Sequence, residues 1–211
     1  WCIAWAILYG LAWRRGCWGA VSETAFRDTP IVTRQDMNDL QTIRDWVRWG
    51  GCRFTEAGLH FGHGTDNAFD EAAWLVAHAL KMPPTLIAEY GACHLTGEER
   101  EAVAALIARR IDERCPAAYL TGRTWFAGLE MTISDQVMVP RSPLAELIVD
   151  GFSPWADPTQ VNRVLDLCTG SGCIGIAAAI HLPDADVDLA DISPAALRVA
   201  MRNRALHGLE D

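Results

Sequence analysis

The segment Val164–Gly175, which reads VLDLCTGSGCIG, constrains the fold of this chain more than any other part of the sequence. Residues Val164–Cys168 are apolar except for Asp166, a pattern that predicts a strand buried on both faces of a parallel sheet. Gly170 and Gly172 follow, and because glycine tolerates a left-handed backbone, they allow a sharp turn and the close approach of a ligand. The segment therefore predicts a strand, a glycine loop and the start of a helix.

A second strand and a second helix follow this loop. The apolar run Val187–Ala190 predicts the strand, and Asp191 stands at its end. Ser193 and Pro194 are typical of a helix start, and that helix is expected to end near Gly208. Strand, helix, strand and helix in this order predict an α/β fold, the first part of a doubly wound, Rossmann-like sheet.

The spacing between the loop and the acid indicates the kind of ligand. Asp191 lies 19 residues after Gly172, where a carboxylate at the end of the second strand can accept both hydrogen bonds of a ribose diol. Amides at the start of the helix attract negative groups of the same ligand. We therefore expect an adenosine-containing cofactor, held by Cys168, Thr169, Gly170, Ser171, Gly172 and Asp191.

Two cofactors carry that ribose, and the pattern G-x-G-x-x-G from Gly170 to Gly175 is by itself compatible with NAD. Asp166 favours S-adenosylmethionine, because a carboxylate near the loop would repel a pyrophosphate but not the cationic amino group of a methionine moiety. The hydroxyls of Thr169 and Ser171 would suit that moiety. Gly175 is then expected to pack helix against sheet, and Asp166 either contacts the cofactor or only binds loop amides. An NAD-dependent oxidoreductase and a non-catalytic protein-binding module are the alternatives.

Composition limits the class of protein. Of the 211 residues, 50% are hydrophobic and 21% are charged, which excludes a disordered or fibrous chain. The formal net charge of −9 predicts repulsion from nucleic acid and attraction to a basic partner. The cysteines form no C-x-x-C pair, which favours a cytoplasmic setting, and the loose set Cys52, His60 and His63 lacks a fourth ligand, so we predict no metal. The apolar run 1–13 is too short to span a bilayer, so no membrane association is expected.

The hydrophobic pattern divides the chain into four parts. Residues 1–36 show no helical or strand period, so we expect a non-native or disordered extension, with Met37 as the native start. Residues 37–116 predict a helical domain, 117–158 a β-hairpin with a linker helix, and 159–211 the part that holds the sheet.

Local patterns place the elements of the two middle parts. The expected elements are helices at 39–51 and 67–80, a helix that follows a capping box of Thr96 and Glu99 and ends before Pro116, strands at 129–133 and 137–139, and a helix at 144–149 that begins after Ser142 and Pro143.

Four segments carry a resemblance to a known family. They are FGHGTDNAFDEA at 61–72, PAAYLTG at 116–122, VPRSPLAELI at 139–148 and DLCTGSGC at 166–173. Together they resemble the protein-(glutamine-N5) methyltransferases, in the branch that modifies a large-subunit ribosomal protein, number three of that subunit. The resemblance covers Met37 to Asp211, and four motifs in the right order are far more specific than the glycine loop alone.

The resemblance implies a fold and a function. It implies a class I methyltransferase sheet, begun at 159–211, that uses S-adenosylmethionine to methylate the N5 nitrogen of a glutamine in that ribosomal protein, in the cytoplasm. The helical domain at 37–116 would recognise the substrate. The family grips the target amide with an Asn-Pro-Pro-Tyr segment, which these 211 residues do not contain, so we assign no catalytic residue. We expect the chain to correspond to the front portion of such an enzyme and to be inactive alone.

Overall fold

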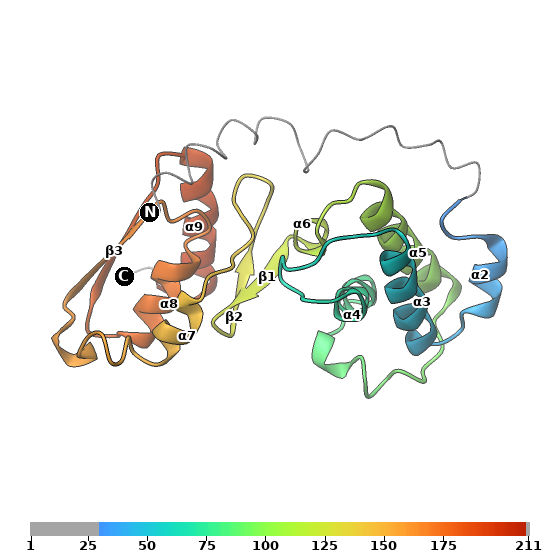
Figure 1. The fold of residues 1–211 in the computed structure, drawn as a ribbon, viewed down its shortest axis with the longest axis horizontal. Coiled ribbons are helices and arrows are strands. Elements are labelled where there is room, and N and C mark those ends of the chain that lie inside the picture. The colour runs from blue at the N-terminus through green and yellow to red at the C-terminus, as the bar shows by residue number, and fades with distance from the viewer. Residues whose placement is uncertain (1–29, 210–211) are drawn as a thin grey trace. The chain divides into compact units, whose positions relative to one another are not determined.

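The computed structural model describes residues 30–209 (Figure 1). Contacts divide the chain into a first unit that extends to Leu120 and a second unit that begins at Thr121. The first unit contains α2 (Arg34–Asp39), α3 (Ile43–Glu56), α4 (Ala68–Ala79), the 3-10 helix η1 (Pro84–Leu86), α5 (Gly97–Asp112) and α6 (Ala117–Thr121), which runs into the boundary. Within this unit α4 packs against both α3 and α5. No helix of residues 30–209 is long and apolar enough to span a membrane.

Three helices of the first unit begin with a capping box. In each, a threonine hydroxyl accepts a hydrogen bond from the amide three residues later, while the acidic side chain at that position accepts one from the threonine amide. The pairs are Thr33 with Asp36, Thr42 with Asp45, and Thr96 with Glu99. The capping box predicted at Thr96 is confirmed.

The helix predicted at 39–51 is present over most of that range, but both of its predicted ends are wrong. Instead α2 ends at Asp39, and α3 begins at Ile43 and continues through Gly50 and Gly51 to Glu56. The capping box at Thr42 starts a new helix, and the two glycines are sites of close packing rather than a helix end. A Cβ atom on Gly51 would lie 2.6 Å from the Phe69 ring, and one on Gly50 would lie 3.0 Å from Ile107 Cδ1.

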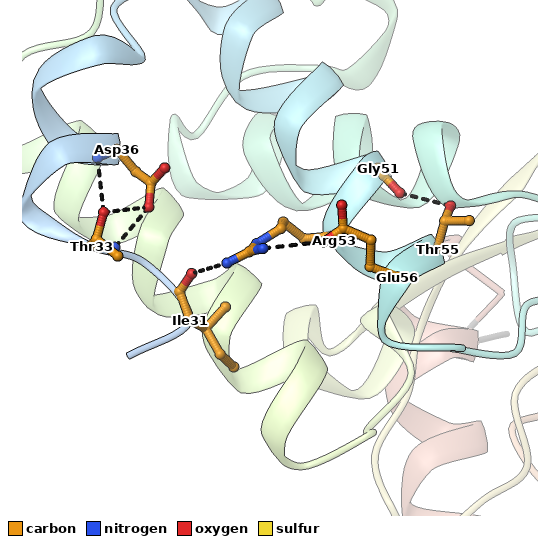
Figure 2. Close-up of polar contacts among 7 residues, drawn as sticks. All are labelled: Ile31, Thr33, Asp36, Gly51, Arg53, Thr55 and Glu56. Atoms are coloured by element: carbon orange, nitrogen blue, oxygen red, sulfur yellow. Dashed lines mark hydrogen bonds and ion pairs between the residues drawn. The ribbon is translucent and has the colours of Figure 1, made fainter. Parts of the chain in front are cut away.

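The chain just before Met37 contacts α3 (Figure 2). The Arg53 guanidinium donates to the Ile31 carbonyl at 3.0 Å and to Glu56 Oε2 at 3.1 Å. The side chain of Ile31 is buried, and Thr33 and Asp36 form the first capping box. Of the extension expected at 1–36, residues 30–36 thus have a defined structure, and residues 1–29 lie outside the described residues.

Asp45 links the capping of α3 to pH. Hydrogen bonds from the Thr42 amide and then from the Thr42 hydroxyl hold the pKa of Asp45 below its ordinary value of 3.8. The ionised carboxylate therefore stabilises the folded chain above that value, and this stabilisation is lost as the pH falls through the lower folded-state pKa.

We expect Asp45→Asn to flatten the loss of unfolding free energy between about pH 5 and about pH 2, measured by urea denaturation. Asp112→Asn, at the last residue of α5 and away from its capping box, is the matched control and should follow the wild type. Identical pH profiles for Asp45→Asn and the wild type would contradict the assignment.

A buried ion pair organises the centre of the first unit. Arg110 Nη2 lies 3.2 Å from Glu71 Oε2, and each side chain is only 3% exposed. Arg110 also donates to the His60 carbonyl at 3.2 Å, and Glu71 Oε1 accepts from the Ala117 amide at 3.0 Å. These bonds connect α4, α5, α6 and the loop before α4.

The second unit begins with a β-hairpin, of which the sequence predicts one strand correctly. The strand predicted at 129–133 is β2 (Leu129–Thr132), but its antiparallel partner is β1 (Arg123–Phe126), and 137–139 is not a strand. Ala127 and Gly128 connect β1 to β2 with φ of 50° and 76°, as a two-residue hairpin turn requires. Because alanine rarely takes that conformation, the turn has no recognisable sequence pattern. The helix predicted at 144–149 is confirmed as α7 (Leu144–Val149).

The predicted order of strand, helix, strand and helix is confirmed. It consists of β3 (Arg163–Leu167), α8 (Cys173–His181), β4 (Asp186–Ala190) and α9 (Pro194–Leu206), preceded by η2 (Pro158–Gln160). Strands β3 and β4 are parallel, with Asp166 opposite Leu189. The segment is the Rossmann-like part of the fold.

The expectation that β3 is buried on both faces is wrong for the described residues. Figure 1 shows α7, α8 and α9 on one side of the two strands. Asp166 faces this covered side and is buried, whereas Leu165 and Leu167 are 62% and 66% exposed. Side chains alternate along a strand, so a helical layer on one side leaves every second residue uncovered.

Candidate functional site

The glycine loop lies between the end of β3 and the start of α8. Its backbone takes a left-handed conformation at Cys168, Gly170 and Gly172, with φ of 63°, 57° and 81°. The Gly172 amide donates to the Thr169 carbonyl at 2.8 Å, which closes the turn. The Thr169 amide donates to the Ala190 carbonyl at 3.0 Å, so the loop is tied to the end of β4.

The two glycines of the loop have different surroundings. A Cβ atom on Gly172 would lie 3.1 Å from Ala200 Cβ and 3.3 Å from Ala200 Cα, because α9 passes directly beside it. A Cβ atom on Gly170 would have nothing within 4 Å. Gly172 therefore permits the packing of the loop on α9, and Gly170 leaves open space in which a ligand could approach the backbone.

The Asp166 side chain accepts hydrogen bonds from the glycine loop and from the start of α8. Its Oδ2 accepts hydrogen bonds from the Thr169 hydroxyl at 2.6 Å and from the Gly175 amide at 2.9 Å, and the residue is 8% exposed. Of the two roles left open for this residue, the structure shows the bonds within the loop. Gly175 packs helix against sheet as expected, since a Cβ atom there would lie 2.2 Å from Leu189 Cδ2.

The structure brings Asp191 to the loop, as its spacing from Gly172 predicts. The Gly170 amide donates to Asp191 Oδ2 at 2.9 Å, and the Ser193 amide donates to Oδ1 at 2.8 Å. Each carboxylate oxygen can accept more than one hydrogen bond, so both oxygens retain capacity for the hydroxyls of a ribose. The half-buried Asp191 is thus held in a fixed orientation beside Gly170.

Two side chains of the loop differ from expectation. Thr169 and Ser171 are 6% and 3% exposed, and the Thr169 hydroxyl already donates to Asp166, so the two residues offer a ligand their backbone rather than their hydroxyls. Cys168 is exposed, and its backbone is left-handed. Cys173 is buried, and burial raises the pKa of its thiol to about 11.

Two residues near the loop were missed by sequence reasoning. Ile192 follows the strand-end acid and is 99% exposed, so it offers apolar surface next to Asp191. An apolar residue directly after such an acid is the pattern that could have revealed it. Asn203 is fully buried in α9 and donates to the Ser171 carbonyl at 2.8 Å. A polar residue on the apolar face of a helix was its only trace in the sequence.

The described residues contain no group of three or more His, Cys, Asp or Glu side chains that could hold a metal ion. The glycine loop and the end of β4 offer backbone groups, the half-buried carboxylate of Asp191 and the exposed apolar side chain of Ile192. Such a set suits an organic ligand with hydroxyls and a flat apolar ring.

Two family models match the chain. Residues 45–122 match the PrmC N-terminal domain, and residues 147–210 match the methyltransferase small domain. The second match contains the whole glycine loop, Asp191 and Asn203.

Curated relatives match across both regions. A ribosomal protein uL3 glutamine methyltransferase of Xanthomonas campestris pv. campestris is 53% identical over 174 residues, which are 82% of this chain and 56% of the relative. Proteins of the same name from Bordetella pertussis and Neisseria meningitidis serogroup B are 49% and 47% identical, over 85% and 86% of this chain and 61% and 60% of their own lengths. The chain thus spans less than two thirds of these relatives. With both family models matched in order along it, the chain belongs to the protein-(glutamine-N5) methyltransferase family, in the branch of relatives named for ribosomal protein uL3.

Proposed function

We propose that the glycine loop binds S-adenosylmethionine and serves the methylation of the N5 nitrogen of a glutamine in a large-subunit ribosomal protein. The observation that carries the proposal is the fixed pairing of Asp191 with Gly170, at 2.9 Å, within a region that matches a methyltransferase domain. The names of the relatives, which specify ribosomal protein uL3, support the choice of substrate.

Each part of the site fits one part of this cofactor. Asp191 would accept hydrogen bonds from the ribose hydroxyls, and Ile192 would pack against the adenine ring. The space above Gly170 would admit the methionine moiety to the loop backbone. When bound, the cofactor supplies a methyl group on a positively charged sulfur. Asp166 would act on the loop, whose shape it fixes through Thr169 and Gly175.

The target amide is a poor nucleophile because its lone pair is delocalised, so it must be aligned with the sulfur for transfer. In the family this alignment falls to an Asn-Pro-Pro-Tyr segment, which the 211 residues do not contain. We therefore assign no catalytic residue in this chain and expect it to bind the cofactor weakly without transferring the methyl group alone.

The helical region at 37–116 is proposed to recognise the protein substrate. The net charge of −9 suits a basic ribosomal partner and opposes direct contact with nucleic acid. A ribosomal substrate, together with a sequence that contains no C-x-x-C pair, also favours a cytoplasmic location for the protein and no association with a membrane.

Isothermal titration calorimetry tests the cofactor, with S-adenosylmethionine, S-adenosylhomocysteine and NAD titrated separately into the chain. Heat of binding from the first two and none from NAD supports the proposal, and the reverse would replace it with an oxidoreductase. Chemical cross-linking to purified ribosomal protein uL3, with an acidic protein of similar size as control, tests the substrate. If the 211-residue chain transferred a labelled methyl group from S-adenosylmethionine to uL3, our expectation that transfer requires the Asn-Pro-Pro-Tyr segment would be wrong.

Asp191→Ala is expected to weaken the binding of S-adenosylmethionine by about 1.5–3 kcal/mol, the usual worth of hydrogen bonds to a charged acceptor. The same titration measures the loss. Asp188→Ala is the matched control, because Asp188 lies on β4, just before Asp191, and its exposed side chain pairs with Arg163 at 3.0 Å. Equal affinities for the wild type and Asp191→Ala would remove this residue from the site.

A further inference from the structure

Asn203 connects three backbone groups in two different parts of the second unit. Its Nδ2 donates to the Thr132 carbonyl at 2.9 Å and to the Ser171 carbonyl at 2.8 Å, and its Oδ1 accepts from the Thr132 amide at 2.7 Å. The side chain has no exposed surface. Thr132 is the last residue of β2, and Ser171 belongs to the glycine loop. One buried carboxamide therefore joins the hairpin to the loop.

The partners fix the orientation of this carboxamide. Both amide hydrogens point to carbonyl oxygens, and the amide oxygen faces a backbone N–H. Exchanging the two ends would set the NH2 group against the Thr132 N–H and the oxygen against two carbonyls. No other neutral side chain of this size supplies two donors and one acceptor in that arrangement.

Helix and strand periods explain how α9 reaches the hairpin. The free edge of β2 offers backbone groups at Glu130 and Thr132, about 6.8 Å apart along a strand. Asn203 lies in the last turn of α9 and His207 directly follows the helix, so the two are about 6 Å apart along its axis. Asn203 binds Thr132, and His207 Nε2 lies 2.7 Å from the Glu130 carbonyl oxygen. Side chains of α9 thus cover the strand edge that β1 leaves unpaired.

The same helix also braces the loop. Ala200, three residues before Asn203, packs against Gly172 together with Ile176 of α8. Ser193, at the start of α9, is bonded through its amide to Asp191. Helix α9 thus contacts the loop region at three points: through Ser193 to Asp191, through Ala200 to Gly172, and through Asn203 to Ser171.

We propose that Asn203 is a positioning residue of the cofactor site, which holds the Ser171 carbonyl, and with it the glycine loop, in register with the hairpin. This inference rests on the proposed function, because the loop is taken to bind S-adenosylmethionine. Asn203 itself touches no cofactor; it acts through the backbone of Ser171 and Thr132.

The experiment compares three variants of the full chain. N203A removes all three bonds, and N203D keeps the acceptor for the Thr132 amide but loses both donors. H207A removes only the bond to Glu130 and serves as the matched control. The readouts are amide hydrogen exchange at Thr132, Gly170 and Gly172, and the affinity for S-adenosylmethionine by calorimetry.

N203A is expected to speed exchange at Thr132 and at the two loop glycines by about ten-fold or more, and to weaken cofactor binding by a similar factor. H207A is expected to leave both loop glycines and the affinity unchanged. Faster exchange at Thr132 with an unchanged loop would overturn the proposal, because the side chain would then serve the hairpin alone.

The pH dependence of N203D distinguishes a positioning role of residue 203 from a merely structural one. A carboxyl group buried beside two carbonyl oxygens has a raised pKa, and its neutral form can again donate one hydrogen bond. As the pH falls from about 8 to about 5, the hydrogen-exchange protection of the loop and the cofactor affinity of N203D should rise toward the wild-type values. The wild type is measured at each pH, because it contains the same His207 and Asp191. A constant ratio of N203D to wild-type values over that range would overturn the proposal.

The outcome for Asn203 is separable from the outcome for the proposed function. If wild-type chain binds no S-adenosylmethionine, the proposed cofactor fails, while coupled exchange at Thr132, Gly170 and Gly172 still decides whether Asn203 holds the loop. If the wild type binds the cofactor and N203A binds it equally well, the proposed function stands and the positioning role falls.

Discussion

Replacing Glu71 with leucine is expected to lower the free energy of unfolding by about 3–5 kcal/mol, the usual cost of removing one partner from a buried ion pair. The change leaves the buried Arg110 guanidinium without its counter-charge, and it removes the acceptor of the Ala117 amide. Leucine has a similar volume, so the loss reflects charge and hydrogen bonding rather than a cavity.

Urea denaturation followed by circular dichroism measures this loss. The double variant Glu71→Leu with Arg110→Met is the informative control, because it removes both charges and replaces them with apolar side chains of similar length. It should recover most of the lost stability, since paired replacement of a buried ion pair is often neutral. If the double variant were as unstable as Glu71→Leu, the hydrogen bonds to Ala117 and His60 would outweigh the ion pair.

The second large effect is expected at Gly172. Gly172→Ala places a side chain on a residue with φ of 81° and within 3.3 Å of the Ala200 backbone. A left-handed non-glycine residue costs about 1–2 kcal/mol, and overpacking adds about 1–3 kcal/mol. Because Ala200 belongs to a helix, relief requires α9 to move away from the loop.

Gly170→Ala is the matched comparison, since its φ is 57° but its Cβ would meet nothing within 4 Å. It should show only the conformational cost of about 1–2 kcal/mol. Thermal unfolding of both variants gives the difference directly. Equal destabilisation by the two substitutions would show that α9 yields and that the contact with Ala200 is unimportant.

The sequence predicted those elements whose ends depend on neighbouring residues. Thr96 with Glu99 predicted the start of α5, and Ser193 with Pro194 predicted the start of α9, because a capping side chain acts over three or four positions. The spacing from Gly172 to Asp191 likewise predicted that the acid meets the loop, since parallel strands end at the same edge.

Features that depend on distant contacts or rare backbone angles were not predictable. The hairpin was misplaced because Ala127 takes a positive φ that its residue type disfavours. Gly50 and Gly51 were read as a helix end, although their role is to admit Ile107 and Phe69 from other helices. Asn203 escaped notice because its partners lie 71 and 32 positions away in the chain.

The close approach of α9 to the glycine loop has a consequence for how such a protein can vary. Position 172 must be glycine for as long as position 200 lies against it, and position 200 must stay small for as long as the loop keeps its turn. A bulkier residue at 200 would have to arise together with a displaced helix, which would also withdraw the carboxamide at 203 from Ser171. We therefore expect the effect of a substitution at residue 172, 200 or 203 to depend on which residues occupy the other two positions.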